Sequence, residues 1–349
     1  MHTALYIFSS ILIIISFIPL IKNDYWTFRI FEYPRLQKLV LTALSLALLL
    51  IFSNRTLTFY IYVTLLSGTI LYLLKQIIPF TPLGKKQILR VKQEVPDQTI
   101  SIMISNVFED NTNYKGCIAE IKKTDADLVL LLETSHEWME QLKEATDAYP
   151  YRIEKPIDNT YGMLLYSKLE LKESEVKFLV EDDIPSIHTK VILRNGQVIQ
   201  LYAVHPTPPV PGENPRSTER DKELLLIADK ALASKIPVIV CGDLNDVAWS
   251  YTTELFLKTS QLLDPRRGRF FLNTFHAHHF FMRFPLDHIF CSTDFKLKKM
   301  KRLNNFDSDH FPILTVLQYE KSADAEQEDN TLDLDQEDRE LAEEKKEKC

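Results

Sequence analysis

The hydrophobic positions divide the chain into an N-terminal part with long apolar runs and a longer part with short, alternating runs. The long runs cover residues 3–21, 39–52 and 57–80. The first and the third are long enough to cross a hydrocarbon core of about 30 Å. The second has only fourteen residues. It either spans with its flanking basic side chains at the interface, or forms a re-entrant hairpin with the third run. We expect three transmembrane helices.

The basic residues near these runs indicate an orientation. They cluster after the first run and after the third, whereas the loop after the second run carries only Arg55. The clustered residues are Lys22, Arg29, Arg35 and Lys38, followed by Lys85, Lys86, Arg90 and Lys92. Lys and Arg are enriched on the cytoplasmic side of membrane proteins. We therefore expect a multi-pass membrane protein whose N-terminus lies outside and whose remaining chain faces the cytoplasm.

From residue 99 onward the pattern predicts strands that alternate with helices. The segment "TISIMISNV" alternates apolar and polar residues, and "ADLVLLLETS" is a continuous apolar run, typical of a strand covered on both faces. Helical spacing follows in "YKGCIAEIKKTDA" and "HEWMEQLKEATDAY". The pair Asn195-Gly196 is a strong hairpin signal, and Ser217 is a candidate helix N-cap. These elements predict an α/β domain of two packed sheets with helices outside.

Polar side chains of a few types recur where the predicted strands end or begin. They are Asn106, Glu133, His205, Asp243 with Asn245, Asp287 with His288, and the tripeptide Ser308-Asp309-His310. Asp, Asn and Gly are also common turn residues, so each position alone has an ordinary structural explanation. Six such boundaries in one domain are hard to assign to turns, because catalytic groups are often built at strand ends gathered at one edge of a sheet. The pattern therefore indicates an active site.

Charge and composition separate the two ends of the chain from its middle. Residues 1–83 carry six basic and two acidic side chains, residues 84–320 have a net charge of −4, and residues 321–349 have a net charge of −7. The last segment has no aromatic residue, so we expect it to be mostly disordered, with a possible short helix near "DRELAEEKKEK".

The four cysteines lack the spacing of a zinc site or a disulfide framework. The expected division is a transmembrane region (1–83), a linker (84–98), a catalytic domain (99–320) and an acidic tail (321–349).

The motifs "SNV", "LLET", "HP", "GDLND", "PLDHIF" and "SDHFPI" occur in this order between residues 99 and 319. In this order they resemble the endonuclease/exonuclease/phosphatase superfamily, and the apolar N-terminal runs resemble those of its membrane-anchored bacterial members. The resemblance implies a four-layer α/β sandwich, two mixed sheets flanked by helices, preceded by transmembrane helices. It also implies hydrolysis of a phosphate ester with Mg²⁺ or Mn²⁺.

The resemblance assigns a role to each matching residue. Asn106, Glu133 and Asp309 would form the metal site, with Glu133 as the principal ligand. Asp243 and Asn245 would position the attacking water and the phosphate oxygens. His310 would contact the phosphate and be oriented by Asp287, and His205 would lie near the leaving group. These residue types suit metal-dependent phosphate hydrolysis, because Mg²⁺ prefers oxygen ligands and imidazoles supply hydrogen bonds or protons near neutral pH.

The sequence leaves the substrate open. His288 stands where inositol phosphatases typically have Arg, which argues against that subgroup. Two modest basic patches, 266–269 and 296–302, and a histidine-rich segment, 276–279, are candidate substrate-facing features. The leading hypothesis is a membrane-anchored, metal-dependent phosphodiesterase that acts on nucleic acid or on a phospholipid headgroup. A phosphomonoesterase and a non-catalytic scaffold are the alternatives. The expected partners are the phosphate ester and the lipid bilayer, and nothing in the sequence indicates an obligate protein partner.

Overall fold

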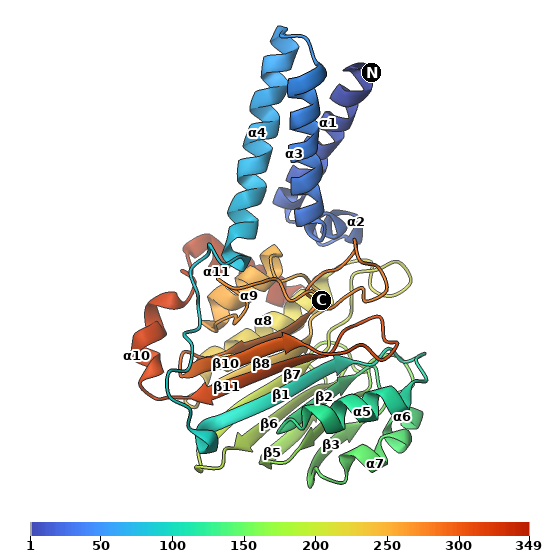
Figure 1. Ribbon diagram of the computed structural model, residues 1–349. Helices are drawn as coiled ribbons and strands as arrows, with labels where there is room; N and C mark the ends of the chain where they lie inside the picture. The colour runs from blue at the N-terminus through green and yellow to red at the C-terminus, as the bar shows by residue number, and fades with distance from the viewer. Residues whose placement is uncertain (1, 349) are drawn as a thin grey trace.

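The computed structural model describes residues 2–348 as a stalk of three helices that rises from an α/β domain (Figure 1). The stalk helices are α1 (His2–Phe17), α3 (Arg35–Phe52) and α4 (Leu57–Ile77). Short 3-10 turns extend α1 and α4, namely η1 (Ile18–Ile21) and η3 (Ile78–Phe80). The loop between α1 and α3 contains α2 (Trp26–Arg29) and η2 (Ile30–Glu32).

By length and composition, all three stalk helices can cross a membrane. The second apolar run forms one continuous helix because the helix begins at Arg35, four residues before the run itself. The helices contact one another through apolar side chains and through hydroxyl groups: the hydroxyl oxygens of Ser9 and Ser45 lie 2.8 Å apart, and those of Ser10 and Tyr62 lie 2.6 Å apart. Such contacts are typical of helices that associate in lipid.

The domain contains two mixed sheets. The first has the strand order β10-β11-β1-β2-β4-β3 and the second the order β5-β6-β7-β8-β9. Only the pairs β1/β2 and β7/β8 are parallel. The strands of the first sheet are β1 (Thr99–Asn106), β2 (Leu128–Leu132), β3 (Tyr151–Lys155), β4 (Met163–Ser167), β10 (Phe295–Arg302) and β11 (Ile313–Tyr319). Those of the second are β5 (Glu170–Lys177), β6 (Ser186–Ile192), β7 (Val198–Val204), β8 (Val238–Asp243) and β9 (Asp287–Cys291).

Helices cover the outer face of each sheet, which gives the expected four layers. The first sheet is covered by α5 (Tyr114–Thr124), α6 (His136–Gln141) and α7 (Lys143–Thr146), and the second by α8 (Thr218–Ala233) and α9 (Tyr251–Ser260). The main core lies between the sheets and is built from the inward-facing positions of both, such as Ile102, Leu130, Leu201 and Ile239. The fold predicted from the apolar pattern is therefore correct.

Some elements differ from the sequence expectation. The basic segment 296–302 forms most of strand β10, an edge strand whose charged side chains protect the sheet from pairing with another chain. Strands β3 and β5 are also edge strands and are mostly polar, so their pattern gave no strand signal. The helix expected over 136–149 is divided at Leu142 into α6 and α7.

The linker and the tail are both packed against the domain. Ile88 lies in the core between the sheets, and Leu89 and Val91 form backbone hydrogen bonds with Leu297 of β10. The tail, which we expected to be mostly disordered, forms α10 (Ala323–Gln327), η5 (Glu328–Asn330) and α11 (Gln336–Glu347). Helix α11 has a capping box and contacts α8 and α9, and the Nζ of Lys345 lies 2.8 Å from Asp221. Composition missed this because ion pairs, rather than a large apolar face, hold the helix.

Candidate active site

The predicted site residues meet where the two sheets present strand ends to one another. Asn106 ends β1, Glu133 directly follows β2, and Asp243 ends β8 opposite Asp287, the first residue of β9. β8 can approach β7 closely because residue 242 is glycine: a Cβ there would lie 1.9 Å from the carbonyl oxygen of Val204. Any side chain at position 242 would clash with β7. The glycine therefore lets β8 bring the carboxylate of Asp243 to this edge of the sheet.

An amide links the two sheets at the centre of the site. The Nδ2 of Asn106 donates to Glu133 Oε1 at 2.6 Å and to Asp243 Oδ2 at 3.1 Å. The Oδ1 of Asn106 accepts from the backbone N–H of Phe108, which fixes which way the amide points. One residue thus sets the relative position of a carboxylate from each sheet.

His310 lies between two carboxylates. Its Nδ1 is 2.8 Å from Asp287 Oδ2 and its Nε2 is 3.5 Å from Asp243 Oδ2. The ring packs against Phe275, with the ring centres 4.9 Å apart. Burial acts to lower the pKa of His310, but the charges of Asp287 and Asp243 outweigh it and raise the pKa to about 10. The imidazole is therefore held as a cation that can donate a hydrogen bond to a phosphate oxygen.

Glu133 is half-buried. Burial, with smaller contributions from Asp309 and Asp243, raises its pKa to about 7 against the opposing effects of Asn106 and His310. Its backbone has a positive φ of 58°, a conformation that residues other than glycine rarely adopt and that often occurs at functional sites. This turn directs the residue after β2 back toward Asn106.

Asn245 and His205 complete the arrangement on the side of β7. The backbone N–H of Asn245 donates to Asp243 Oδ1 at 2.9 Å, and its Nδ2 donates to the carbonyl of Pro206 at 2.9 Å. His205 is buried, and burial lowers its pKa to about 4, so the ring is neutral. Its Nδ1 has no hydrogen-bond partner among residues 2–348.

The site has an excess of buried acid that suits a cation. Asp309 Oδ1 and Asp287 Oδ1 are buried without a hydrogen-bond partner in the described chain, and Glu133 and Asp243 lie nearby. Ligand atoms of Asp243, Asp287 and His310 lie within 4.8 Å of one another. However, the hydrogen bond between His310 and Asp287 accounts for two members of that group. The oxygen donors of the predicted ligands, Asn106, Glu133 and Asp309, are the better match to a hard divalent ion.

The structure also shows supporting residues that the sequence did not indicate. Asp246, three residues after Asp243, faces away from the site and lies 3.0 Å from Arg29 and 3.1 Å from Arg220. Arg220 also donates to the carbonyl of Asn245 at 2.7 Å. Arg29 comes from the loop between α1 and α3, 217 positions away in the chain. No local pattern could have revealed that this loop supports the segment after β8.

His288 and Arg266 support the same segment from β9. The Nε2 of His288 is 2.9 Å from the carbonyl oxygen of Asp246, and its Nδ1 is 2.7 Å from Arg266. Arg266 is itself buried and paired with Asp264 at 2.8 Å. The first candidate basic patch is therefore largely internal, and Arg266 is not available to bind a polyanion.

Comparison with known families agrees with this geometry. The model of the Endonuclease/Exonuclease/phosphatase family matches residues 103–310, a span that contains all the predicted site residues. A search of curated protein sequences found no significant match.

Solved structures share the fold at low sequence identity. A humanized D. rerio TDP2 is 18% identical with a TM-score of 0.51, and the match covers 63% of this chain and 99% of that one. An endonuclease/exonuclease/phosphatase family protein from Bacteroides thetaiotaomicron is 16% identical with a TM-score of 0.52, covering 64% of this chain and 96% of that one. A mannosyl-6-phosphatase from the same organism is 17% identical with a TM-score of 0.50, covering 63% and 100%. The stalk lies outside the residues that the family model matches.

Proposed function

Because this chain belongs to the Endonuclease/Exonuclease/phosphatase family, whose members are phosphoesterases, we propose that it is a membrane-anchored hydrolase of phosphodiester bonds that uses Mg²⁺ or Mn²⁺. The observation that carries the proposal is the group formed by His310 between Asp243 and Asp287, next to the Asn106–Glu133 pair. Cationic and anionic groups lie side by side there, as the binding of a phosphate and the activation of water require.

In this proposal each side chain has one task. The imidazolium of His310 donates from Nε2 to a phosphate oxygen, while Asp287 holds its Nδ1. The carboxylate of Asp243 accepts a proton from the attacking water, since the protonated His310 cannot. The water oxygen bonds to phosphorus and the ester bond on the opposite side breaks. The released oxygen takes up a proton from solvent water, and Asp243 returns the proton that it accepted to the solvent. Neutral His205 donates a further hydrogen bond near the leaving group.

Asn106, Glu133 and Asp309 would hold the divalent ion. When bound, the ion neutralises charge on the phosphate and stabilises the leaving oxygen. Two observations support the assignment. Burial raises the pKa of Glu133 to about 7, and Asp309 Oδ1 is buried without a partner in the described chain. A bound cation would stabilise the ionised form of Glu133 and give Asp309 a partner.

The test uses the full-length chain in detergent or nanodiscs. Hydrolysis of bis-p-nitrophenyl phosphate, single-stranded DNA and p-nitrophenyl phosphate is measured with Mg²⁺, with Mn²⁺ and with EDTA, and His310→Ala serves as the inactive control. Metal-dependent cleavage of diesters that His310→Ala abolishes supports the proposal. Release of phosphate from the monoester alone would select a phosphomonoesterase instead, and equal turnover by His310→Ala would reject the site.

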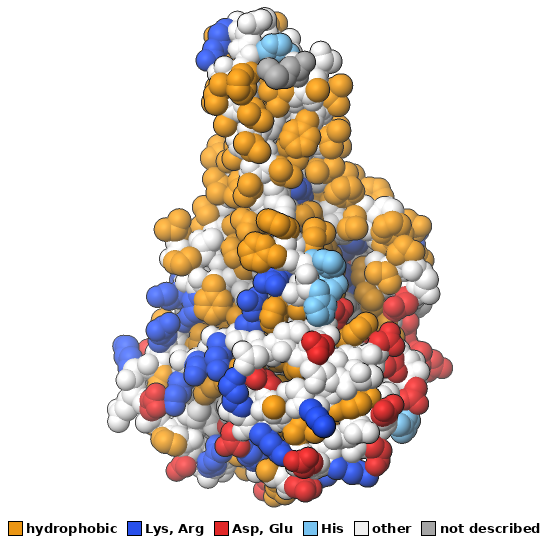
Figure 2. Space-filling view, turned by 45° about the vertical axis from the view of Figure 1, so that its right-hand side comes forward, with side chains coloured by type: hydrophobic (Ala, Val, Ile, Leu, Met, Phe, Trp, Pro, Cys, Tyr) orange, Lys and Arg blue, Asp and Glu red, His pale blue; other side chains and the backbone are white. Residues whose placement is uncertain are grey.

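A second candidate, a lipid-directed phosphodiesterase, is favoured by the loop 276–283. Phe280 and Phe281 are 71% and 79% exposed, and the carbonyl of Phe281 accepts a hydrogen bond from Gln37 of α3. Both phenylalanines line a hollow of about 620 Å³ with Val40 and Leu41, which are apolar stalk residues. Figure 2 shows apolar side chains that continue from the stalk onto the adjacent face of the domain, with histidines beside them.

The same loop reaches the active site. The backbone N–H of Ala277 donates to the carbonyl of Asp309 at 2.6 Å, and Phe275 packs on His310. With α3 in a bilayer, the exposed phenylalanines would enter the same leaflet, because burying each one is worth about 2 kcal/mol. The site would then open beside the membrane surface, where a phospholipid phosphate is within reach.

Replacing both Phe280 and Phe281 by Ser separates this candidate from a nuclease. We expect at least a tenfold loss of turnover on phospholipid vesicles and unchanged turnover on bis-p-nitrophenyl phosphate. Phe178→Ser, at an exposed aromatic position at the end of β5, is the matched control. Equal loss on both substrates, or no lipid turnover by the unaltered chain while DNA is cleaved, would reject the lipid-directed function.

A further inference from the structure

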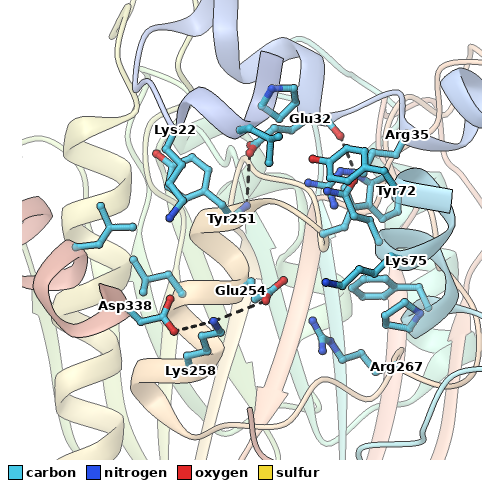
Figure 3. Close-up of a pocket in the computed structure, with 18 residues that line it drawn as sticks. Lys22, Glu32, Arg35, Tyr72, Lys75, Tyr251, Glu254, Lys258, Arg267 and Asp338 are labelled. Atoms are coloured by element: carbon cyan, nitrogen blue, oxygen red, sulfur yellow. Dashed lines mark hydrogen bonds and ion pairs between the residues drawn. The ribbon is translucent and has the colours of Figure 1, made fainter. Parts of the chain in front are cut away.

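A hollow of about 450 Å³ lies at the junction between the stalk and the domain, away from the active site (Figure 3). Its upper wall comes from the turn after α1 and from the ends of α3 and α4 that lie nearest the domain, and its lower wall comes from α9, α11 and the segment at Arg267. Neither the family match nor the proposed chemistry assigns a function to this hollow.

Cationic side chains outnumber acidic ones in its lining. The cations are Lys22, Arg35, Lys75, Lys258 and Arg267, and the acids are Glu32, Glu254 and Asp338. Each of the three acids already has a cationic partner. Asp338 lies 2.7 Å and Glu254 3.9 Å from Lys258, and Glu32 lies 3.1 Å from Arg29. Lys22 pairs with Glu337 outside the hollow. These pairs satisfy Lys22 and Lys258, the two cations drawn on the left of Figure 3.

The other three cations, drawn on the right of Figure 3, have no such partner. Within residues 2–348 the side chains of Arg35, Lys75 and Arg267 form no hydrogen bond and no ion pair, although Arg35 is only 6% exposed. The Nε of Arg267 is buried without a partner, and burial lowers the pKa of this guanidinium. Burying a charged group without a counterion costs several kcal/mol. That cost applies to Arg35 and Arg267, whereas Lys75 is exposed, so the arrangement suits an anion that enters from outside.

The position of the three cations indicates which anion. Lys75 lies in the last turn of α4 and Arg35 is the first residue of α3, so both are at the domain-side ends of the candidate spans. Tyr72 and Trp249 also line the hollow, and aromatic residues of this kind concentrate at the level of lipid headgroups. With the three helices in a bilayer, the hollow faces the headgroup layer, where basic side chains attract anionic lipids.

We propose that this hollow binds the phosphate of an anionic phospholipid headgroup through Arg35, Lys75 and Arg267. The bound lipid would be a structural ligand, distinct from any substrate at His310. Its effect would reach the active site through Trp249, which packs on Phe80 of η3 with ring centres 6.0 Å apart and belongs to the segment that follows Asp243. Occupancy of the hollow would therefore steady the segment after β8.

The test compares two double variants of the full-length chain in nanodiscs. Lys75→Gln with Arg267→Gln removes two unpaired cations, and Lys22→Gln with Lys258→Gln removes two paired cations from the same lining. Native mass spectrometry measures retention of phosphatidylglycerol against phosphatidylcholine, and inorganic phosphate is added as a competitor. Each interfacial cation contributes about 1 kcal/mol, so loss of two of them should weaken binding of phosphatidylglycerol by the first variant about thirtyfold. The second variant should bind it as the unaltered chain does.

Three results would overturn the proposal. They are equal retention of both lipids by the unaltered chain, an equal loss in both double variants, and displacement of lipid by millimolar inorganic phosphate, which would assign the hollow to a free anion. Thermal unfolding of each variant checks its folding. If the first double variant unfolds, Lys75→Gln alone, at an exposed position, gives the same comparison with one charge removed.

Discussion

Two groups of carboxylates lie on opposite sides of the segment after β8, and they differ in the number of cationic side chains that neutralise them. On the active-site side, Asp243 and Asp287 share one imidazole, and within residues 2–348 Glu133 and Asp309 form no ion pair with a Lys or Arg. On the far side, Asp246, Asp221 and Asp24 are matched by Arg29, Arg220 and Lys345. The first side is short of positive charge, and the second is balanced.

The ion pairs of the balanced side stabilise the fold and offset the destabilising repulsion among the acids of the active-site side. Unpaired buried acids repel one another and lower stability, which is acceptable only where an added cation and a substrate use that charge. Asp243 and Asp246 illustrate the division, since they are three residues apart in "GDLND" and face different partners. Proximity in the sequence therefore does not imply a shared task.

The largest expected effect comes from Asp243→Asn. Loss of the proton acceptor should lower turnover of bis-p-nitrophenyl phosphate about 1,000-fold, in the range measured for removal of a general base. Because one repelling charge is also removed, the midpoint of thermal unfolding should stay the same or rise. A fall in the midpoint together with retained turnover would show that Asp243 belongs to the structural side.

The same substitution three residues later, Asp246→Asn, should do the reverse. Arg29 and Arg220 would keep their positive charges in a buried position without the carboxylate between them, which typically costs about 3–5 kcal/mol. Denaturant unfolding should show this loss of stability. Below the new unfolding midpoint, turnover per folded molecule should fall by less than tenfold; a 1,000-fold loss would place Asp246 in the chemistry.

An added divalent ion should stabilise the unbalanced side only. At a concentration one hundred times its dissociation constant, a ligand that binds only the folded state adds about 2.7 kcal/mol. Thermal unfolding of the unaltered chain should therefore shift upward with Mg²⁺ or Mn²⁺ and return with EDTA. Glu133→Gln should lose the shift, and Asp246→Asn should retain it. A shift that persists in Glu133→Gln would exclude Glu133 as the principal ligand.

The smallest effect concerns the balanced side at low pH. Burial opposes ionisation of Asp221, but Lys345 and Arg220 hold its pKa well below the ordinary value. Because the folded pKa is depressed, the ionised form stabilises folding above the unfolded pKa of about 4, and this contribution is lost as the pH falls below it. The protection of the α11 amides against hydrogen exchange, relative to the intrinsic rate at each pH, should therefore fall below about pH 4. Lys345→Met should lower this protection already at neutral pH, whereas Lys22→Met, which removes an exposed ion pair with Glu337 of α11, should change it little.

The sequence predicted the parts of the molecule that local rules determine. Strand ends gather at one edge, so Asn106, Glu133, Asp243, Asp287 and His310 could be brought together from their places in the pattern alone. The structure adds the orientation of each side chain, such as the amide of Asn106 donating to carboxylates of both sheets. Their individual roles in metal binding and catalysis remain the proposal made above.

What could not be predicted depends on contacts between distant segments. Arg29 supports Asp246 across 217 positions, and Lys345 reaches Asp24 across 321. Neither pairing leaves a local pattern. The tail has the composition of a disordered segment, yet Leu341 and Ala342 pack on α8 and α9 while its charges find partners already present there. Composition measures the chain alone, whereas this helix is stabilised by the surface beneath it.

The loop between α1 and α3 has a consequence for biosynthesis. Its Arg29, Glu32 and Tyr33 bind Asp246, Trp249 and the carbonyl of Asn245. The ribosome makes this loop more than 200 residues before the segment that it supports. The domain therefore completes its fold against a support that has already been synthesised before β8 is translated. A fragment that begins after α4 lacks this support from the start, and it would be a poor substitute for the whole chain.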